Sequence, residues 1–292
     1  MTVRRGPRTA RVLVVGIVLI LAVSGFALLP RPSSSGADRA VEPSAAAPSV
    51  SAPSAAPSAA APSGQDTRPI SVVGFGDSVM AGAGCDCDDF LVQTGTLLHD
   101  RTERSVTTTN HGVNGETTTD LLRELRTDDA SAAAIAGADV IVLTAGANDL
   151  LPAVGTWQDD GCDTDCYDPA VHAMGDRLRA ILAVVDREKK PTAAVLVTSY
   201  WNVFEDGDVG RDAHGAGFLA WSDEIPRSAD RAICAAADRA AATCVDLYRP
   251  FKGVGDRDPT GLLADDGDHP NARGTRLIAA TVVGAAASLL PR

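Results

Sequence analysis

Two polar segments far apart in the chain contain residues that could act together in nucleophilic catalysis. Ser78 follows a short apolar run, and His269 comes just before the last predicted helix. A serine hydroxyl is a poor nucleophile unless a base removes its proton. A histidine can be that base when a carboxylate fixes its tautomer and stabilises its charged form. Asp266 can be that carboxylate because it lies three residues before the histidine in the same turn, and Asp268 is its rival.

Two further segments could stabilise the negative charge of a tetrahedral intermediate, which needs preorganised hydrogen-bond donors. The backbone N–H groups of Ser78 and Gly115 and the side-chain amide of Asn148 would supply three. Gly115 suits this role because a residue without a Cβ lets the backbone approach a substrate closely. Each segment alone is a weak signal, since Gly-x-Asn-Asp is more often a turn. Their order, each after a predicted strand or before the last helix, favours a catalytic site.

Short apolar runs alternate with amphipathic segments after residue 70, and they predict the elements that position these residues. We expect strands at 70–75, 105–109, 139–145, 193–199 and 243–246. We expect helices at 89–102, 117–126, 129–136, 169–188, 228–241 and 271–289, with Asp168 and Asn271 as N-caps. Strands separated by helices indicate an α/β fold with a parallel sheet, and five strands fit a flavodoxin-like order. Ligands of such sheets bind at the carboxyl ends of the strands, where Ser78 falls.

Two predicted loops, 150–167 and 201–220, are longer than packing requires, and long loops in compact domains are usually functional or mobile. Aromatic residues in or beside them either wall an acyl or sugar pocket or pack the loops onto the body: Trp157, Trp201, Phe204, Phe218 and Trp221. His111 could line the pocket, but a surface loop is the favoured interpretation. The remaining histidines are interpreted as surface or helix residues: His99, His172 and His214.

The first 69 residues do not resemble a globular domain. Residues 12–29 carry no charge and follow four arginines, a pattern that keeps the first end in the cytoplasm. The apolar run is long for a signal peptide and near the minimum for a membrane span. With no good cleavage site directly after it, a signal anchor in residues 1–30 is slightly favoured over a cleaved signal peptide. Residues 31–69, rich in Ala, Pro and Ser, predict a disordered linker, and residues 70–292 form the domain.

Export follows from either form of the N-terminal segment, so we expect an extracytoplasmic protein that is membrane-anchored or secreted. The chain has a formal net charge of −12. Its acidity argues against a nucleic-acid partner, because an acidic body repels phosphate backbones. A dense set of acidic residues could suggest calcium, but without a fixed ligand loop we favour solvated loops: Asp86, Asp88, Asp89, Asp159, Asp160, Asp163 and Asp165.

The six cysteines fit disulfides in an oxidising compartment. Cys234 with Cys244 is the favoured pair, and Cys162 with Cys166 would close a small loop. Cys85 and Cys87 could pair with each other only in a strained ring, so a cross-link to the 162/166 loop stays open. A zinc site built from these cysteines is the less favoured alternative.

On these motifs the chain resembles the SGNH hydrolases, also called the GDSL esterase/lipase superfamily. The first block matches residues 76–78, Gly-Asp-Ser, with Val79 in place of the usual Leu, and the later blocks match Gly115, residues 146–149 and residues 266–269. The resemblance covers about residues 70–290. It implies a three-layer α/β/α sandwich and no cofactor or metal. It also implies Ser78, Asp266 and His269 as a triad and Ser78, Gly115 and Asn148 as the oxyanion hole. The ordinary α/β-hydrolase fold is disfavoured because the serine lacks the Gly-x-Ser-x-Gly elbow.

The sequence therefore predicts an exported serine esterase that hydrolyses carboxylic esters through an acyl-enzyme. Its substrates would be lipid or small acyl esters, or O-acyl groups on glycans. The alternative is a catalytically silent, cell-surface glycan-binding module on the same fold, which the intact serine, amide and histidine argue against. We expect a monomer that contacts the membrane through its N-terminal segment.

Overall fold

The computed structural model describes residues 67–161, 163–202 and 204–290. In this part of the chain one parallel sheet has the strand order β2-β1-β3-β4-β5, which is the flavodoxin-like order predicted from the sequence. The strands lie within one or two residues of their predicted limits, except that the second extends three residues further. They are β1 (Ile70–Gly76), β2 (Val106–Gly112), β3 (Val140–Thr144), β4 (Ala194–Thr198) and β5 (Thr243–Val245).

The three inner strands form the core of the sheet. Every residue of β3 and β4 is buried, as are all residues of β1 except Ser71. Helices cover both faces of a parallel sheet, so its inner strands appear in the sequence as continuous apolar runs rather than as alternating patterns. The edge strand β2 carries polar, partly exposed side chains instead. This difference explains why the inner strands were the clearest signal in the sequence.

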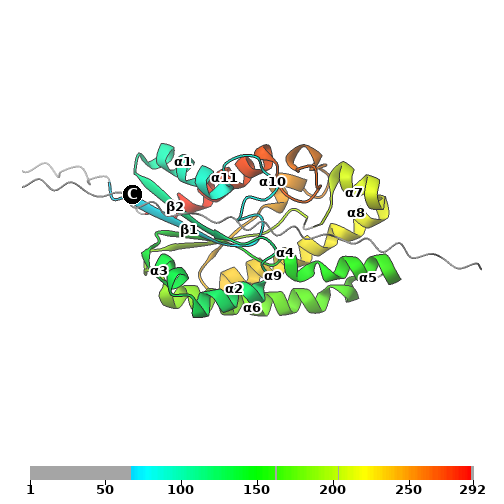
Figure 1. The fold of residues 1–292 in the computed structure, drawn as a ribbon, viewed down its shortest axis with the longest axis horizontal. Coiled ribbons are helices and arrows are strands. Elements are labelled where there is room, and N and C mark those ends of the chain that lie inside the picture. Colours follow the sequence, from blue (N-terminus) through cyan, green and yellow to red (C-terminus); the bar gives the residue numbers. More distant parts are fainter. Residues whose placement is uncertain (1–66, 162, 203, 291–292) are drawn as a thin grey trace, which may run out of the picture. The chain divides into compact units, whose positions relative to one another are not determined.

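Helices form a layer on each face of the sheet (Figure 1). On one face, helices α1 and α11 pack against each other, and on the other face α6 packs between α2 and α9, with α3 beside them. The two layers confirm the predicted three-layer architecture. Their bounds are α1 (Phe90–Thr102), α2 (Thr118–Thr127), α3 (Asp129–Gly137), α6 (Asp168–Glu188), α9 (Glu224–Arg239) and α11 (Ala272–Ala286).

The structure shows which residues cap the first turns of α6 and α11, for which Asp168 and Asn271 were the predicted N-caps. The Asn271 side chain caps α11 by accepting from the N–H groups of Arg273 and Gly274, as predicted. The prediction that Asp168 caps α6 is wrong, because it is already the first helical residue and Tyr167 takes the cap position. The helical bonds begin one residue earlier, where the N–H of Val171 donates to the carbonyl of Tyr167. Asp168 instead puts its negative charge in the first turn, where the helix dipole favours it.

The two segments predicted as long loops contain helices. The first holds α5 (Pro152–Asp160) and a 3-10 turn (Thr164–Cys166) and begins at the end of α4 (Ala147–Leu150). The second holds α7 (Gly207–His214) and most of α8 (Ala216–Ser222). These helices are too short for a clear apolar period, and Gly161 and Gly215, both with positive φ, end α5 and α7. In Figure 1, α5, α7 and α8 lie together at the end of the domain opposite the start of β1. We call these three helices the cap.

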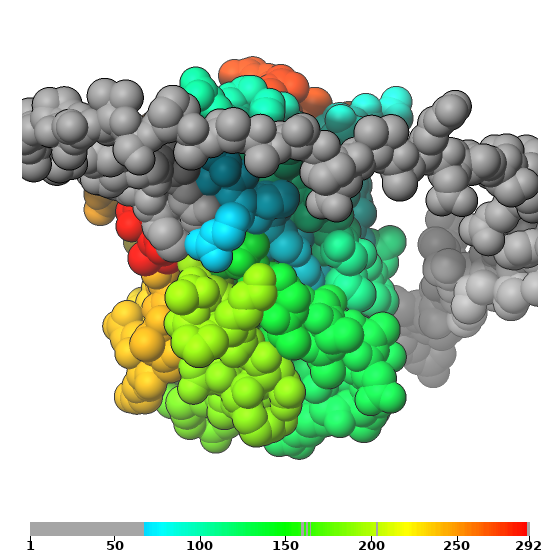
Figure 2. Space-filling view, turned by 90° about the vertical axis from the view of Figure 1, so that its left-hand side faces the viewer, coloured from blue at the N-terminus to red at the C-terminus, as the bar shows by residue number. Residues whose placement is uncertain are grey.

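The opposite end of the domain carries the turns that enter the strands. Figure 2 shows the turn into β4 (yellow-green) between the α2–α3 region (green) and the turn into β5 (yellow-orange). The predicted functional residues all follow strand ends or precede α11, and none belongs to these turns. The carboxyl edge of the sheet, beneath the cap, is therefore where the site has to be sought. Two short elements complete this edge, α10 (Tyr248–Lys252) and a second 3-10 turn (Thr260–Leu262).

The disulfides agree with the sequence in one case and correct it in another. Cys234 is bonded to Cys244, as predicted, and the bond joins α9 to β5. Cys85 is bonded to Cys87, so the cross-link from these residues to the 162/166 loop is wrong. The chain turns sharply there, and the two Cα atoms lie 5.1 Å apart, within the usual range for a disulfide. Cys166 is also disulfide-bonded, while the predicted partner Cys162 lies outside the described residues.

The N-terminal segment 1–30 and almost all of the linker 31–69 also lie outside the described residues. Among the helices that the structure describes, none combines the length and apolar character that a bilayer span requires. In the same residues, no cluster of three or more His, Cys, Asp or Glu side chains could hold a metal ion.

Candidate active site

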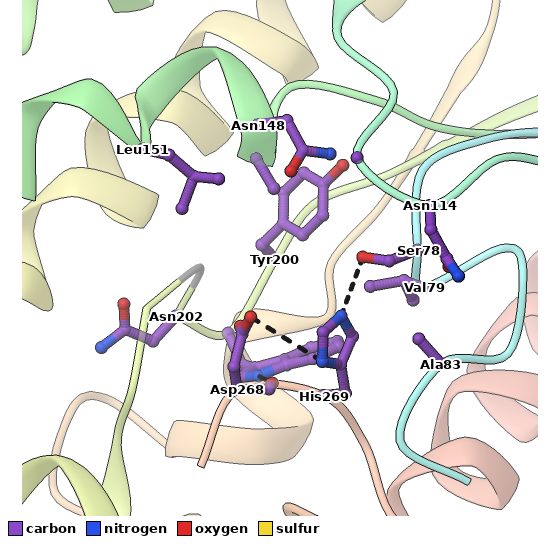
Figure 3. A pocket seen from close by; sticks show the side chains of 13 residues that line it. Ser78, Val79, Ala83, Asn114, Asn148, Leu151, Tyr200, Asn202, Asp268 and His269 are labelled. Carbon is purple, nitrogen blue, oxygen red and sulfur yellow. Dashed lines mark hydrogen bonds and ion pairs between the residues drawn. The ribbon is translucent and has the colours of Figure 1, made fainter. Parts of the chain in front are cut away.

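The two most distant predicted residues meet above the carboxyl end of β1. Ser78 lies in the turn after this strand, and its Oγ is 2.9 Å from Nε2 of His269 (Figure 3). On the other side of the ring, Nδ1 is 2.7 Å from Oδ2 of Asp266. Because a carboxylate only accepts hydrogen bonds, the proton of the neutral ring belongs on Nδ1. Nε2 is then free to accept the proton of the serine hydroxyl.

The geometry also separates the two rival carboxylates. Oδ2 of Asp268 is 3.8 Å from Nδ1 of His269, too far for a hydrogen bond. Partial burial opposes ionisation of Asp266, but hydrogen bonds from the Asp268 backbone N–H and from His269 lower its pKa below the ordinary value. Burial raises the pKa of Asp268 to about 6. Asp266 is therefore the better partner for a positively charged imidazole, in both distance and charge.

The loop that carries the histidine is fixed on several sides. Oδ1 of Asp266 accepts from the backbone N–H groups of Asp268 and His269, both at 3.0 Å, which closes the turn on itself. The indole N–H of Trp201 donates to the carbonyl of Asp268 at 3.2 Å. Gly84, with φ +77°, lies so close that a Cβ there would be 2.4 Å from Cβ of His269. A glycine is needed where the serine loop and the histidine loop touch.

The three predicted oxyanion donors line the same pocket as His269. Within the described part of the chain, the backbone N–H groups of Ser78 and Gly115 make no hydrogen bond. The side-chain amide of Asn148 donates one hydrogen to the carbonyl of Glu116 at 2.9 Å, which leaves its second hydrogen for a ligand. Gly115 has φ +79° and open space where a Cβ would be. Its backbone conformation alone favours glycine, and the predicted close approach to a substrate stays a prediction.

A buried network that the sequence analysis missed holds the amide in position. The carboxylate of Asp149 accepts from the N–H and the hydroxyl of Thr118, at 2.8 and 2.7 Å, and pairs with Arg177 at 2.7 Å. Thr118 begins α2, three residues after Gly115. Asp149 therefore ties the segment with Asn148 to the loop with Gly115. The sequence feature that could have indicated this network is Asp149, the last residue of the Gly-x-Asn-Asp segment, for which the sequence suggested no role.

A second missed network lies under the serine. Asp77 is fully buried and accepts from the hydroxyls of Tyr200, at 2.5 Å, and Thr144, at 3.1 Å, and from the Val79 N–H. These residues follow or end β4, β3 and β1, so the carboxylate joins three strand ends. Burial raises the pKa of Asp77 to about 6, although these hydrogen bonds oppose the rise. Residues 199–202, Ser-Tyr-Trp-Asn, directly follow a buried strand and carry hydroxyl, indole N–H and amide groups. This cluster of polar groups at a strand end could have indicated a role for Tyr200 in the site.

The pocket over Ser78 has a volume of about 380 Å³. Figure 3 shows the Ser78 hydroxyl pointing to His269, with Asn148 and Tyr200 on the side toward α4. The long segments contribute to its wall. Its lining residues are Ser78, Val79, Ala83, Asn114, Gly115, Ala147, Asn148, Leu151, Tyr200, Trp201, Asn202, Asp268 and His269.

Some of the aromatic residues of the two long segments line the pocket, and others pack those segments onto the body, so each predicted role applies to part of the set. Trp201 lines the pocket and stacks on Phe251, with ring centroids 4.2 Å apart. Trp157 and Trp221 instead pack against Phe218 and hold the cap together, with centroids 5.1 and 5.8 Å from that ring. Phe204 and Phe218 line a second cavity beside His269.

The remaining histidines are not at the reacting centre. His111 is not on a surface loop, because it belongs to the edge strand β2 and stacks on Phe75 with centroids 4.7 Å apart. His99 and His172 lie on α1 and α6, as predicted. His214 ends α7 and also lines the second cavity, which the sequence analysis missed.

Solved structures share this fold. A lipase, Lip_vut3, from a goat rumen metagenome is 19% identical with a TM-score of 0.63, covering 74% of this chain and 97% of that one. Axe2, an acetylxylan esterase from Geobacillus stearothermophilus, is 16% identical with a TM-score of 0.54, covering 74% and 94%. A lipase/acylhydrolase from Enterococcus faecalis is 20% identical with a TM-score of 0.53, covering 76% and 98%. At these identities the likeness concerns the fold alone. A search of curated proteins gives no match.

The sheet order and the two helix layers are those of the SGNH hydrolase fold, and the family match places the chain among the carboxylic ester hydrolases of that fold. Residues 75–277 match the GDSL-like Lipase/Acylhydrolase family, and the chain belongs to that family. The match begins in β1 and ends inside α11, so it contains every predicted site residue.

Proposed function

We propose that this chain is an exported serine esterase that hydrolyses carboxylic esters through an acyl-enzyme on Ser78. The observation that carries the proposal is the relay of two short contacts, 2.9 Å from the Ser78 hydroxyl to His269 and 2.7 Å from His269 to Asp266. Such a relay lets the imidazole take the serine proton while the carboxylate stabilises the charge that appears on the ring.

In the first half-reaction, His269 accepts the proton of Ser78 as the serine oxygen attacks the ester carbonyl carbon. The carbonyl oxygen gains the negative charge and lies against the Ser78 and Gly115 N–H groups and the Asn148 amide. When the carbon–oxygen bond to the alcohol breaks, His269 gives its proton to the leaving oxygen. Alcohol departs and the acyl group stays on the serine.

Deacylation repeats these steps with water. His269 takes a proton from water, and the hydroxide attacks the acyl carbon, again with the charge against the three donors. The serine oxygen leaves, recovers its proton from His269, and the carboxylic acid is released. The histidine carries every proton, so apart from the attacking water the route uses only groups of this chain.

The proposed substrates are small acyl or lipid esters, or O-acyl groups on glycans. The structural neighbours include both lipases and an acetylxylan esterase, so the likeness in fold does not choose between these. Export through the N-terminal segment, a monomeric state and the absence of a nucleic-acid partner are part of the same proposal. They rest on the sequence.

The test is a panel of p-nitrophenyl esters from acetate to palmitate, with acetylated xylan as a glycan ester. It compares residues 67–292 with the Ser78→Ala variant. We expect the unaltered domain to release p-nitrophenol and the variant to lose this activity almost completely. A domain that binds acetylated xylan without cleaving it, and cleaves none of the esters, would be a glycan-binding module instead.

A further inference from the structure

A second cavity adjoins the active-site pocket on the cap side of His269. It has a volume of about 480 Å³ and shares Leu151, Asp268 and His269 with the first pocket. Three cap helices contribute to it: α5, the end of α7 and α8. It is lined by Leu151, Val154, Gly155, Gln158, Phe204, Glu205, His214, Phe218, Asp266, Asp268 and His269.

The side chains of this cavity differ sharply in polarity. Leu151 and Val154 supply exposed or half-buried apolar groups, and Phe204 and Phe218, which also line the cavity, are almost completely buried. Three carboxylates also line it, those of Glu205, Asp266 and Asp268, whose side chains are 44%, 47% and 36% exposed. The cavity is therefore rich in hydrogen-bond acceptors, and it has an apolar portion.

One carboxylate of the cavity is held in place by a neighbouring side chain and can still accept hydrogen bonds from a ligand. Oε2 of Glu205 is 2.8 Å from Nε2 of His214, and this contact holds the carboxylate at the cavity. A carboxylate offers about four acceptor positions, so one such contact leaves Glu205 able to bind further donors. Gln158, exposed on α5, adds an amide that can donate or accept.

The position of the cavity, beyond His269, indicates which part of the ester could enter it, the acyl part or the alcohol part. His269 must give its proton to the leaving oxygen, so the alcohol part of the substrate departs on the side of the imidazole. The first pocket surrounds the acyl carbon at Ser78, and the second cavity continues beyond His269. The group attached to the leaving oxygen is the part of the substrate that can reach it.

We infer that this cavity is the alcohol subsite and that it binds a neutral, hydroxyl-rich group such as a sugar ring. Hydroxyl groups would donate to Glu205 and to the other carboxylates, and the C–H face of the ring would lie on Leu151. A fatty chain is disfavoured, because it would remove these carboxylates from water without replacing their hydrogen bonds. A quaternary ammonium would be attracted by the three carboxylates, but it has no N–H or O–H to donate to them. Phe204 and Phe218 are also almost completely buried and offer it little ring face.

This inference rests on the proposed function, and the test uses four acetate esters that differ only in the alcohol. They are methyl acetate, 6-O-acetylglucose, octyl acetate and acetylcholine. We expect kcat/KM to be highest for 6-O-acetylglucose. Higher values for octyl acetate or acetylcholine would overturn the subsite, while the esterase proposal would stand. Failure to cleave any of the four would contradict the esterase proposal itself.

The Glu205→Leu variant tests the acceptor directly. We expect kcat/KM for 6-O-acetylglucose to fall about tenfold or more, the size of losing a hydrogen bond to a charged group. Methyl acetate hydrolysis should change less than about twofold, since its alcohol does not reach the cavity. Octyl acetate hydrolysis should rise. The exposed Gln158→Leu variant should act in the same direction and guards against misfolding of the first variant.

The matched control is Asp212→Leu, which removes an exposed carboxylate of α7 that does not line the cavity. It should leave the ratio of 6-O-acetylglucose to methyl acetate hydrolysis unchanged. Equal losses on all substrates in both lining variants would point to a structural role and overturn the inference. A ratio that the lining variants leave unchanged would overturn it as well.

Discussion

The carboxyl edge of the sheet and the cap meet at His269, but they are built by different means. At the sheet edge, each polar residue follows a parallel strand or precedes a long helix, and backbone register fixes its place. In the cap, the helices have nine residues or fewer, and side-chain contacts hold them. In the proposed function, the first region carries the reacting groups, and in the inferred subsite the second region contacts the alcohol part of the substrate.

Aromatic packing holds the cap together, whereas a nearly buried ion pair joins it to the rest of the domain. Nζ of Lys252 lies 2.5 Å from Asp206 and 3.2 Å from Asp223, with both the lysine and Asp206 nearly buried. Asp206 precedes α7, and its backbone N–H donates to the carbonyl of Gly267 at 2.7 Å. This ion pair therefore connects the cap, through one hydrogen bond, to the loop that carries Asp266 and His269.

The largest expected effect contrasts two carboxylates of that loop. Asp266→Asn keeps the acceptor for the loop backbone but turns an amide toward the imidazole, which favours the wrong tautomer. We expect kcat for a p-nitrophenyl ester to fall by about 10⁴. Asp268→Asn is the control and should cost less than about tenfold. Comparable losses in the two variants would contradict the choice of Asp266, 2.7 Å from Nδ1 of His269, over Asp268, 3.8 Å from the same atom.

The next effect concerns the donors at the sheet edge. Asn148→Ala removes a side-chain amide that can stabilise the oxyanion, and we expect kcat to fall by about 10²–10³ with a small change in KM. Asn114 lines the same pocket but has no proposed role in stabilising the oxyanion, so Asn114→Ala is the control and should change kcat less than about tenfold. Unchanged turnover in the first variant would exclude Asn148 from the site.

A third variant tests how the cap is held. Lys252→Met leaves the buried carboxylate of Asp206 without its cation, and we expect a loss of about 3 kcal/mol in the free energy of unfolding. Lys190→Met breaks the more exposed pair with Asp139, 2.9 Å long, and should cost less than about 1 kcal/mol. Urea denaturation measures both. Equal costs would mean that the cap does not depend on its buried ion pair.

The smallest effect is a pH dependence beside the oxyanion loop. Burial, and then the charge of Glu124, raise the pKa of Glu116 from 4.5 to about 8. Between these values the folded protein holds a proton that the unfolded chain has lost, so this carboxyl contributes stability below about pH 4.5 that is lost by about pH 8. We expect Glu116→Gln to flatten the fall in urea midpoint between pH 5 and 9. Parallel pH curves for the two proteins would contradict the raised pKa.

The sequence predicted the sheet edge well because its signals are local. Buried runs such as residues 140–144 predict inner strands, and the topology of a parallel sheet then places Ser78 and Asn148 on one edge. Asp266 could be proposed, but its preference over Asp268 depended on a turn whose hydrogen bonds appear only in three dimensions.

The cap could not be predicted in the same way. Its helices are short, glycine separates them, and aromatic side chains that could have lined a pocket partly serve as its core. Glu205 and His214 lie nine positions apart, and nothing in the spacing indicates that they meet at a cavity beside His269. Tyr200 and Asp77 were missed for a similar reason, since their contact joins residues 123 positions apart.

The most direct test of the account is whether Ser78 is chemically activated. The domain is treated with a fluorophosphonate, which reacts with serines that an adjacent base has activated, and the modified peptide is identified by mass spectrometry. We predict one label, on Ser78, that is lost in the His269→Ala variant. No label on Ser78, or a label that persists without His269, would contradict the relay from carboxylate through imidazole to hydroxyl.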